Sequence, residues 1–375
     1  MDYRRMPIEI ESPEQVGYAN IRCNLTESSV SDMPLAALGL DLNALILAYT
    51  DHLGKPALRE RIAADGENLS PQDVIVTPSA AAALFIVATS LLEKDNHLVV
   101  MHPNYATNIE TPRAIGCQVD YLRLSFESGF QFDLDQLAAL LRPETRLISL
   151  TTPHNPTGVT LTEKDLRAAA ALAEAKGCYL LVDETYREMN FAGPTPLAAS
   201  ISPRCISVAS MSKSYGLPGI RIGWIITRDP NLQETFLAAK EQIFICNSVV
   251  DEEIALHVLE QKENILPPIL EKNRRNFEIV KTWMEAQKRL EWVEPTGGVV
   301  CFPRIKPAAD LHVDAFYQIL NNQYSTFVGP GHWFGMDRRY MRIGYGWPPA
   351  EELIEGLHHI SLALEEAKEK RKSRN

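Results

Sequence analysis

A lysine among small and hydroxylated residues, Lys213, is the side chain of this sequence best suited to chemistry. Ser210 and Ser212 precede it, and Arg221 follows eight residues later in a glycine-rich run. A lysine becomes a nucleophile when burial or nearby cations lower the pKa of its amine. Hydroxyls and a guanidinium beside such an amine form a cradle for phosphate, which indicates chemistry on an aldehyde with a phosphate anchor. A surface lysine in a flexible loop is the alternative.

The run from 210 to 224 reads Ser-Met-Ser-Lys-Ser-Tyr-Gly-Leu-Pro-Gly-Ile-Arg-Ile-Gly-Trp. It resembles the cofactor-lysine signature of the class I and II aminotransferases, which are fold-type I enzymes dependent on pyridoxal 5'-phosphate (PLP). Further segments with this resemblance extend over nearly the whole chain. The resemblance implies that Lys213 holds the cofactor aldehyde in covalent linkage, and that it later acts as the general base on the substrate α-proton.

Strands and helices alternate between residues 74 and 226, which predicts an α/β fold with a mainly parallel sheet wound by helices. The resemblance implies the PLP-dependent transferase fold type I, with seven strands in this sheet and a smaller α+β domain. We expect an N-terminal arm with part of the small domain at 1–45, a large PLP-binding domain at 46–255, and a small C-terminal domain at 256–375. Ligands of such sheets gather at the carboxyl ends of the strands.

Two predicted strands end in side chains that suit a pyridine ring. Asp183 follows the apolar strand 178–182, and a buried acid needs a partner such as a protonated ring nitrogen. The turn 151–158, fixed by two prolines, contains Asn155. The resemblance implies that Asn155 and Tyr186 bind the phenolic oxygen of the ring, and that Asn155 also contacts the substrate. An acid that only caps a turn is the alternative for Asp183.

A strand, a turn of small residues and a helix start at 74–84 form a second candidate anion site, because backbone N–H groups and the helix dipole favour phosphate there. A plain helix start is the alternative. The family often has glycine at position 79, and we expect the serine found here to adopt an ordinary backbone conformation. The expected phosphate ligands are Ser79, Ala80, Ala81, Ser210 and Arg221.

Two tyrosines and one histidine have candidate roles around the same ring. Tyr49 begins a segment that resembles the family's Tyr-x-x-x-x-Gly-x-x-x-Leu-Arg, which implies contact with the phosphate of a neighbouring subunit and a homodimer with shared active sites. Tyr105 follows the strand 98–101 and either stacks on the pyridine or packs in the core. His154 either supports the ring indirectly or simply packs.

The candidate substrate ligands lie near the two ends of the chain. Arg342 stands in an apolar strand, where a guanidinium is costly unless it meets an anion. Its planar fork suits a carboxylate, and the resemblance assigns it to the substrate α-carboxylate, with a structural ion pair as the alternative. Glu27 replaces the glycine-containing turn of the family, and it either faces a cationic substrate group or is an exposed loop acid.

The composition excludes several other classes of protein. The chain has 375 residues and a net charge of −11 without basic runs, which disfavours nucleic acid as a partner. No apolar run reaches the roughly 20 residues of a membrane helix. The six cysteines form no Cys-x-x-Cys pair, which favours a reducing cytoplasm. We assign no metal site.

The function expected from these features is transfer of an α-amino group from an amino acid to a 2-oxo acid. The C-terminal third also resembles capreomycidine-synthase-like enzymes at 273–275, 297–304 and 328–335. A PLP-dependent lyase or cyclase acting on a (hydroxy)arginine-like amino acid is therefore the alternative, and Glu27 is compatible with a guanidinium substrate. A non-catalytic PLP-binding regulatory module is a third possibility, which the acidic composition disfavours.

Overall fold

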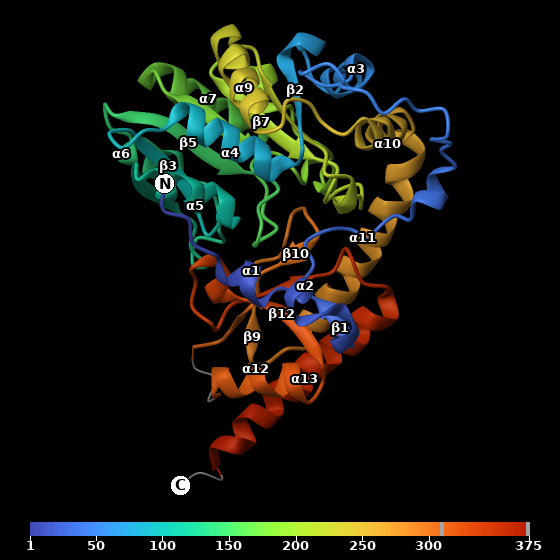
Figure 1. The fold of residues 1–375 in the computed structure, drawn as a ribbon. Helices are drawn as coiled ribbons and strands as arrows, with labels where there is room; N and C mark the ends of the chain where they lie inside the picture. Colours follow the sequence, from blue (N-terminus) through green and yellow to red (C-terminus); the bar gives the residue numbers. More distant parts are fainter. Residues whose placement is uncertain (308–310, 373–375) are drawn as a thin grey trace.

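A computed structural model describes residues 1–307 and 311–372, arranged in two lobes (Figure 1). The larger lobe contains a seven-stranded sheet, in which β8 runs antiparallel to both of its neighbours and the remaining pairs are parallel. This confirms the predicted mainly parallel sheet. The strand order is β2 (Val74–Thr77), β8 (Gly223–Thr227), β7 (Cys205–Ser210), β6 (Tyr179–Asp183), β5 (Thr145–Thr151), β3 (His97–His102) and β4 (Gln118–Arg123).

Helices cover both faces of this sheet, so its central strands are continuous apolar runs. Successive side chains of β3 illustrate the alternation, because Leu98 and Val100 belong to one core cluster and Val99 and Met101 to another. The first cluster contains residues of α4 (Ala80–Leu91) and α9 (Pro230–Ile243), with α5 (Ala106–Ile115) beside α4. The second cluster contains residues of α6 (Leu134–Leu140), α7 (Glu163–Lys176) and α8 (Ala198–Ile201).

The smaller lobe is built from both ends of the chain. Its four-stranded sheet has the order β1 (Cys23–Leu25), β12 (Thr326–Pro330), β13 (Met341–Gly344) and β10 (Val300–Cys301), and β1 pairs in parallel with β12. A two-stranded sheet of β9 (Leu290–Glu291) and β11 (Arg304–Ile305) lies beside it. The boundaries 1–45, 46–255 and 256–375 stay predictions.

The long helix α11 (Lys262–Glu285) connects the lobes (Figure 1). Leu266, near its start, packs in a core cluster of the larger lobe, whereas Phe277 and Val280 pack in the core of the smaller one. The remaining helices are α1 (Pro7–Glu11), α2 (Pro13–Val16), α3 (Pro56–Ala63), α10 (Val249–Glu260), α12 (Val313–Asn322) and α13 (Ala350–Lys372). Within the residues that the structure describes, no helix is both long enough and apolar enough to cross a membrane.

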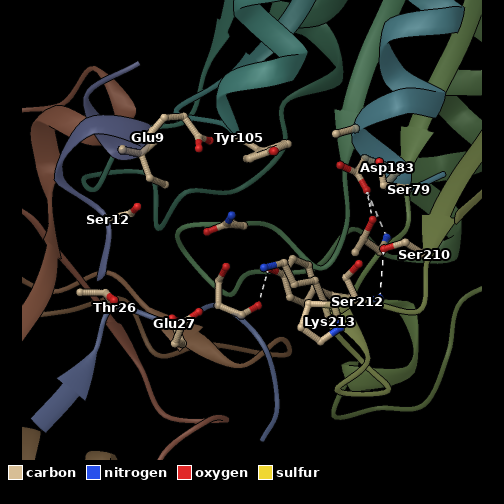
Figure 2. A pocket seen from close by; sticks show the side chains of 18 of the residues that line it. Glu9, Ser12, Thr26, Glu27, Ser79, Tyr105, Asp183, Ser210, Ser212 and Lys213 are labelled. Atoms are coloured by element: carbon tan, nitrogen blue, oxygen red, sulfur yellow. Dashed lines mark hydrogen bonds between the residues drawn. The ribbon is translucent and has the colours of Figure 1, made fainter. Parts of the chain in front are cut away.

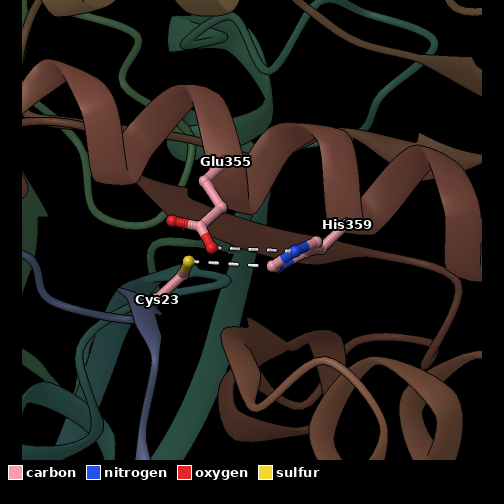
Figure 3. Close-up of side chains that lie close together, drawn as sticks. All are labelled: Cys23, Glu355 and His359. Atoms are coloured by element: carbon pink, nitrogen blue, oxygen red, sulfur yellow. Dashed lines mark hydrogen bonds and ion pairs between the residues drawn. The ribbon is translucent and has the colours of Figure 1, made fainter.

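A group of polar side chains joins the first strand to the last helix (Figure 3). Cys23 Sγ lies 3.9 Å from His359 Nδ1, and Glu355 lies one helical turn before His359 on α13. Both oxygens of Glu355 accept hydrogen bonds from Arg22, at 3.0 and 2.7 Å. Thr326 Oγ1 is 2.7 Å from His359 Nδ1. These contacts attach β1 and β12 to α13. We call Cys23, Glu355 and His359 the small-lobe cluster.

Candidate active site

A cavity lies where the carboxyl ends of the large-sheet strands face the N-terminal arm (Figure 2). One wall comes from the sheet edge and includes Ser79 after β2, Tyr105 after β3, Asp183 at the end of β6, and Ser210 at the end of β7. The opposite wall comes from residues 8–9, 12–14 and 26–28. Such an edge is where ligands of open parallel sheets bind. The cavity therefore brings most of the predicted site residues together.

Lys213 lies three residues beyond β7 and contributes its side chain to the cavity. Its backbone carbonyl accepts a hydrogen bond from Val30 N at 3.1 Å, which ties the lysine loop to the arm. Burial lowers the pKa of the Lys213 amine; the charge of Glu27 opposes this shift, and Arg342 adds to it. A lowered pKa increases the neutral fraction of the amine, which is the form that attacks an aldehyde.

Asp183 is a buried carboxylate, only 5% exposed, at the end of β6. Oδ1 accepts from Thr185 N at 3.1 Å and from Thr185 Oγ1 at 2.6 Å. Burial raises the pKa of Asp183, and within the described part of the chain no cation pairs with it. An unpaired buried carboxylate is costly, so a protonated ring nitrogen is a fitting partner. The supporting residue Thr185 was missed from sequence, although a hydroxyl two residues after an acid is a known turn pattern.

Arg342, in β13, is 3% exposed and also lines the cavity. Nη1 donates to Asn155 Oδ1 at 3.0 Å and Nη2 donates to the Thr26 carbonyl at 2.5 Å. Nε has no hydrogen-bond partner, and no carboxylate within the described residues forms an ion pair with the guanidinium. The structural ion pair considered above is therefore not formed here, and the guanidinium remains available to an anion.

Asn155 and Tyr186 lie beside these groups in the cavity wall. The Tyr186 hydroxyl donates to the Ser28 carbonyl at 2.7 Å, so its donation to a ring oxygen stays a prediction. Asn155 Oδ1 accepts from Arg342, which couples the predicted ring ligand to the predicted carboxylate ligand. Both side chains are at most 5% exposed, which fixes their positions.

The first turn of α4 faces the cavity with Ser79, Ala80 and Ala81, as the anion-site prediction requires. The expected ordinary backbone conformation at Ser79 is wrong, because its φ is 135° and its ψ is 165°. This is a region almost exclusive to glycine. The Ser79 hydroxyl accepts from Ala82 N at 3.1 Å and so caps the helix. A Cβ at Gly223 would lie 2.4 Å from the Ser79 carbonyl carbon, so the absence of a side chain there lets β8 approach this turn.

Three more polar residues surround this helix start. Ser210 and Ser212 are buried and line the cavity, with Ser212 N donating to Ser210 Oγ at 3.4 Å. Arg221 is exposed, has a φ of 46°, and donates from Nη1 to the Pro218 carbonyl at 2.8 Å. Hydroxyls and a guanidinium around a helix N-terminus form an anion site. Ser212 was in the motif but not among the predicted ligands.

The three aromatic and histidine candidates differ in their position relative to the cavity: Tyr105, Tyr49 and His154. Tyr105 precedes α5 and lines the cavity, as a stacking residue must. Tyr49 is 83% exposed and does not line it, so any contact with phosphate has to come from a second subunit. His154 lies outside the cavity lining and hydrogen-bonds with Thr157 Oγ1 at 2.7 Å and the Pro103 carbonyl at 2.8 Å. Burial lowers the pKa of His154 to about 4, so it is neutral near pH 7.

Acidic residues of the arm form part of the cavity wall. Glu27 is half-buried, and its Oε1 accepts from Tyr18 Oη at 3.1 Å and from Asn24 Nδ2 at 3.3 Å. Glu9 and Glu14 also line the cavity, although both are solvent-exposed. Sequence reasoning missed Glu9 and Glu14 because residues 1–20 contain no motif that would place them near Lys213.

The family model for aminotransferase class I and II matches residues 32–360. The chain belongs to the class I and II aminotransferases. An arginine–pyruvate transaminase from Pseudomonas aeruginosa is 29% identical over 85% of this chain and 82% of its own length. Capreomycidine synthase from Streptomyces vinaceus is 30% identical over 91% of this chain and 87% of its own length. A crystal structure of a PLP-dependent aminotransferase from Streptococcus suis superimposes with a TM-score of 0.91 at 27% identity, over 98% and 99% of the two chains.

Family membership confirms the resemblance found in the sequence, the fold-type I architecture, and PLP as the cofactor. The chain is a PLP-dependent aminotransferase, and the named relatives include enzymes that use arginine and aspartate as well as a synthase. The residues of the cavity fit this cofactor independently of the family. A helix start lies beside hydroxyls, a buried acid has no cation among the residues that the structure describes, and the lysine amine has a pKa lowered by burial.

Proposed function

We propose that this aminotransferase moves the α-amino group of an amino acid to a 2-oxo acid, with the cofactor held at Lys213. The observation that supports this most is the set of unmatched charges in one cavity. Asp183 lacks a cation, and Arg342 lacks an anion, within the described residues. A pyridine nitrogen and a substrate α-carboxylate would neutralise them respectively.

Each remaining residue has one task in this proposal. PLP, when bound, supplies an electron sink that acidifies the proton on the substrate α-carbon. Lys213 Nζ, freed when the substrate amine takes its place on the aldehyde, would remove that proton and hold it for redelivery, which its lowered pKa favours. Asp183 keeps the ring nitrogen protonated, and Arg342 orients the substrate through its carboxylate. Asn155 and Tyr186 would bind the ring oxygen, and Tyr105 would stack on the ring. The residues that would hold the phosphate are Ser79, Ala80, Ala81, Ser210 and Arg221.

The proposal includes a homodimer with shared active sites in the cytoplasm. Ile46, Leu47 and Tyr49 are 80, 77 and 83% exposed in the single chain, which is unusual for a contiguous apolar stretch. A second copy would cover this stretch and bring Tyr49 to the phosphate of the first. All six cysteines are free, as expected in a reducing compartment.

An exchange assay tests the reaction. The holoenzyme is incubated with 15N-labelled amino acids and an unlabelled 2-oxo acid, and we expect the label in the amino acid formed from the acceptor. Lys213→Ala protein should bind PLP without covalent linkage and lose turnover. Release of a side-chain substituent with no transfer of label would contradict transamination.

A lyase or cyclase is the second candidate, because capreomycidine synthase from Streptomyces vinaceus is 30% identical to this chain. The two reactions share removal of the α-proton by Lys213 and diverge afterwards. The same assay separates them when a hydroxyarginine is supplied without an acceptor. A product of elimination or ring closure would favour this second candidate.

A further inference from the structure

We infer that the arm wall of the cavity selects amino acids with a cationic side chain, such as a guanidinium or an ammonium group. The inference rests on the proposed function, because it assumes that Arg342 binds the substrate α-carboxylate. It concerns the substrate side chain and the residues Glu27, Glu14 and Glu9. We call these three residues the arm acids.

The charges that line the cavity leave the arm acids without an assigned partner. The cations in the described lining are Lys213, Arg221 and Arg342. In the proposed function they hold an aldehyde, a phosphate and a carboxylate, so none remains for a second substrate carboxylate. Asp183 is the other acid of the described lining, and the proposed function assigns it to the ring nitrogen. The unassigned charges of the lining are therefore all negative.

Glu27 is best placed of the three to contact a substrate. It follows Thr26, whose carbonyl accepts from Arg342 Nη2, so the acid lies one residue from the carboxylate anchor. Tyr18 and Asn24 both donate to Oε1, which leaves Oε2 for another donor. Its charge also acts on Lys213 and Arg342, which places it within electrostatic range of both. A half-buried carboxylate with two neutral donors is fixed in position but not neutralised.

Helix α1, which carries Glu9, is held in place by the side chain of Glu11. Glu11 Oε2, also on α1, accepts from Trp333 Nε1 at 2.7 Å and lies 2.9 Å from His332 Nε2. This attaches α1 to the turn 331–334, next to the cavity. Glu9 is thereby kept on the arm side of the cavity, across from Lys213 (Figure 2), and Glu14 on α2 lines the same cavity.

An independent observation indicates that the cavity is built for a charged ligand of defined orientation. Arg342 Nε is buried and lacks a hydrogen-bond partner in the described part of the chain, although the residue lines the cavity. A ligand carboxylate at Arg342 fixes one end of the substrate, and the α-carbon must then face Lys213. With the substrate held in this way, its side chain would extend toward the arm residues that line the cavity.

The test compares donors that differ in side-chain charge. The holoenzyme is assayed with L-arginine, L-lysine, L-norleucine and L-glutamate, and the Kd of each is measured by absorbance titration of the bound cofactor. We expect kcat/KM and affinity to favour the cationic donors over L-norleucine by at least about 10-fold, and over L-glutamate by more. In Glu27→Gln, which keeps the acceptor for Tyr18 and Asn24, this preference should fall by about 10-fold or more, with the loss of affinity greater for L-arginine and L-lysine than for L-norleucine.

Glu60→Gln, an exposed acid on α3 outside the cavity, is the matched control and should leave all four donors unchanged. Glu9→Gln and Glu14→Gln should have smaller effects that high salt removes, because both acids are exposed. Preference for a neutral or acidic donor, or a cationic preference that survives Glu27→Gln, overturns the inference while transamination stands. Failure of the proposed function would appear differently, as an absence of label transfer from every donor, and the Kd values would still test the selectivity.

Discussion

The cavity and the small-lobe cluster both collect ionisable side chains, but they differ in how well those groups are matched. In the cavity, no described residue pairs a cation with Asp183 or offers an acceptor to Arg342 Nε. In the small-lobe cluster, Glu355 is held by Arg22 through both oxygens and His359 has a hydrogen bond with Thr326. Groups that resemble a metal site by composition are thus largely satisfied by their neighbours.

The difference shows that unmet polar requirements identify a ligand site better than residue types that lie close together. A buried charge without a partner lowers the stability of the fold unless a ligand neutralises it. A side chain that already has its partners has little to gain from a ligand. The following predictions test this contrast.

The largest effect is expected at the unmatched arginine of the cavity. Arg342→Gln removes the anchor for the substrate α-carboxylate, and truncating one partner of a buried charge pair costs about 2–5 kcal/mol, or roughly 30-fold or more in kcat/KM. The measurement is steady-state kinetics with a responsive amino acid. Arg22→Gln, at the small-lobe cluster, is the control and should stay within about 2-fold. Equal losses in both variants would remove the contrast.

A second effect concerns Glu184, which follows Asp183 and is 1% exposed. Oε1 accepts from Ala198 N at 2.8 Å, and Oε2 forms no hydrogen bond within the described residues, although Ser207 is close enough to favour the charged form. Burial raises the pKa of Glu184 to about 7 from 4.5, so the folded state binds the proton more tightly than the unfolded state. The contribution of Glu184 to stability is therefore present below pH 4.5 and is lost as the pH rises through 7.

The isosteric variant Glu184→Gln removes the ionisable carboxyl group and so isolates its pH-dependent contribution to stability. Between pH 5 and pH 8 the free energy of unfolding of the wild type should fall by up to about 3 kcal/mol more than that of the variant. Denaturant unfolding at the two pH values gives this difference. Parallel pH profiles for the two proteins would show that the Glu184 carboxylate has an ordinary pKa.

A smaller effect on stability is expected at Ser79, the strained N-cap of α4. Ser79→Gly relieves a backbone conformation that costs about 1–3 kcal/mol. Because glycine caps a helix less well than serine by a few tenths of a kcal/mol, the free energy of unfolding of the apoprotein should rise by roughly 1 kcal/mol. Ser79→Ala keeps the strain and loses the cap, so it should lose about 1 kcal/mol. Thermal unfolding of both variants measures the effect. A destabilised glycine variant would refute the proposed strain.

The smallest effect is expected at the small-lobe cluster. Because Glu355 and His359 already have protein partners, added Zn²⁺ should leave the melting temperature unchanged. Thermal unfolding with and without the ion is the measurement. A rise in melting temperature that disappears in His359→Gln would show a metal site where we assign none.

Much of the fold and the core of the site could be predicted from sequence, because these features depend on local patterns. Apolar strands that end in Asp183 or precede Lys213 predict both the sheet and the edge at which ligands bind. The backbone of Ser79 could not be predicted, because the approach of Gly223 from another strand imposes it. Glu9 and Glu14 were missed because only the packing of α1 and α2 brings them to the cavity wall.

The central proposal is that the amine of Lys213 holds the cofactor. Borohydride reduction of the PLP-loaded protein, followed by proteolysis and mass spectrometry, tests it directly. We predict a pyridoxyl phosphate adduct on the peptide that contains residue 213, and no adduct in Lys213→Ala. A modified wild-type protein whose adduct lies on another lysine, or a PLP-supplied protein with no adduct, would contradict the proposal.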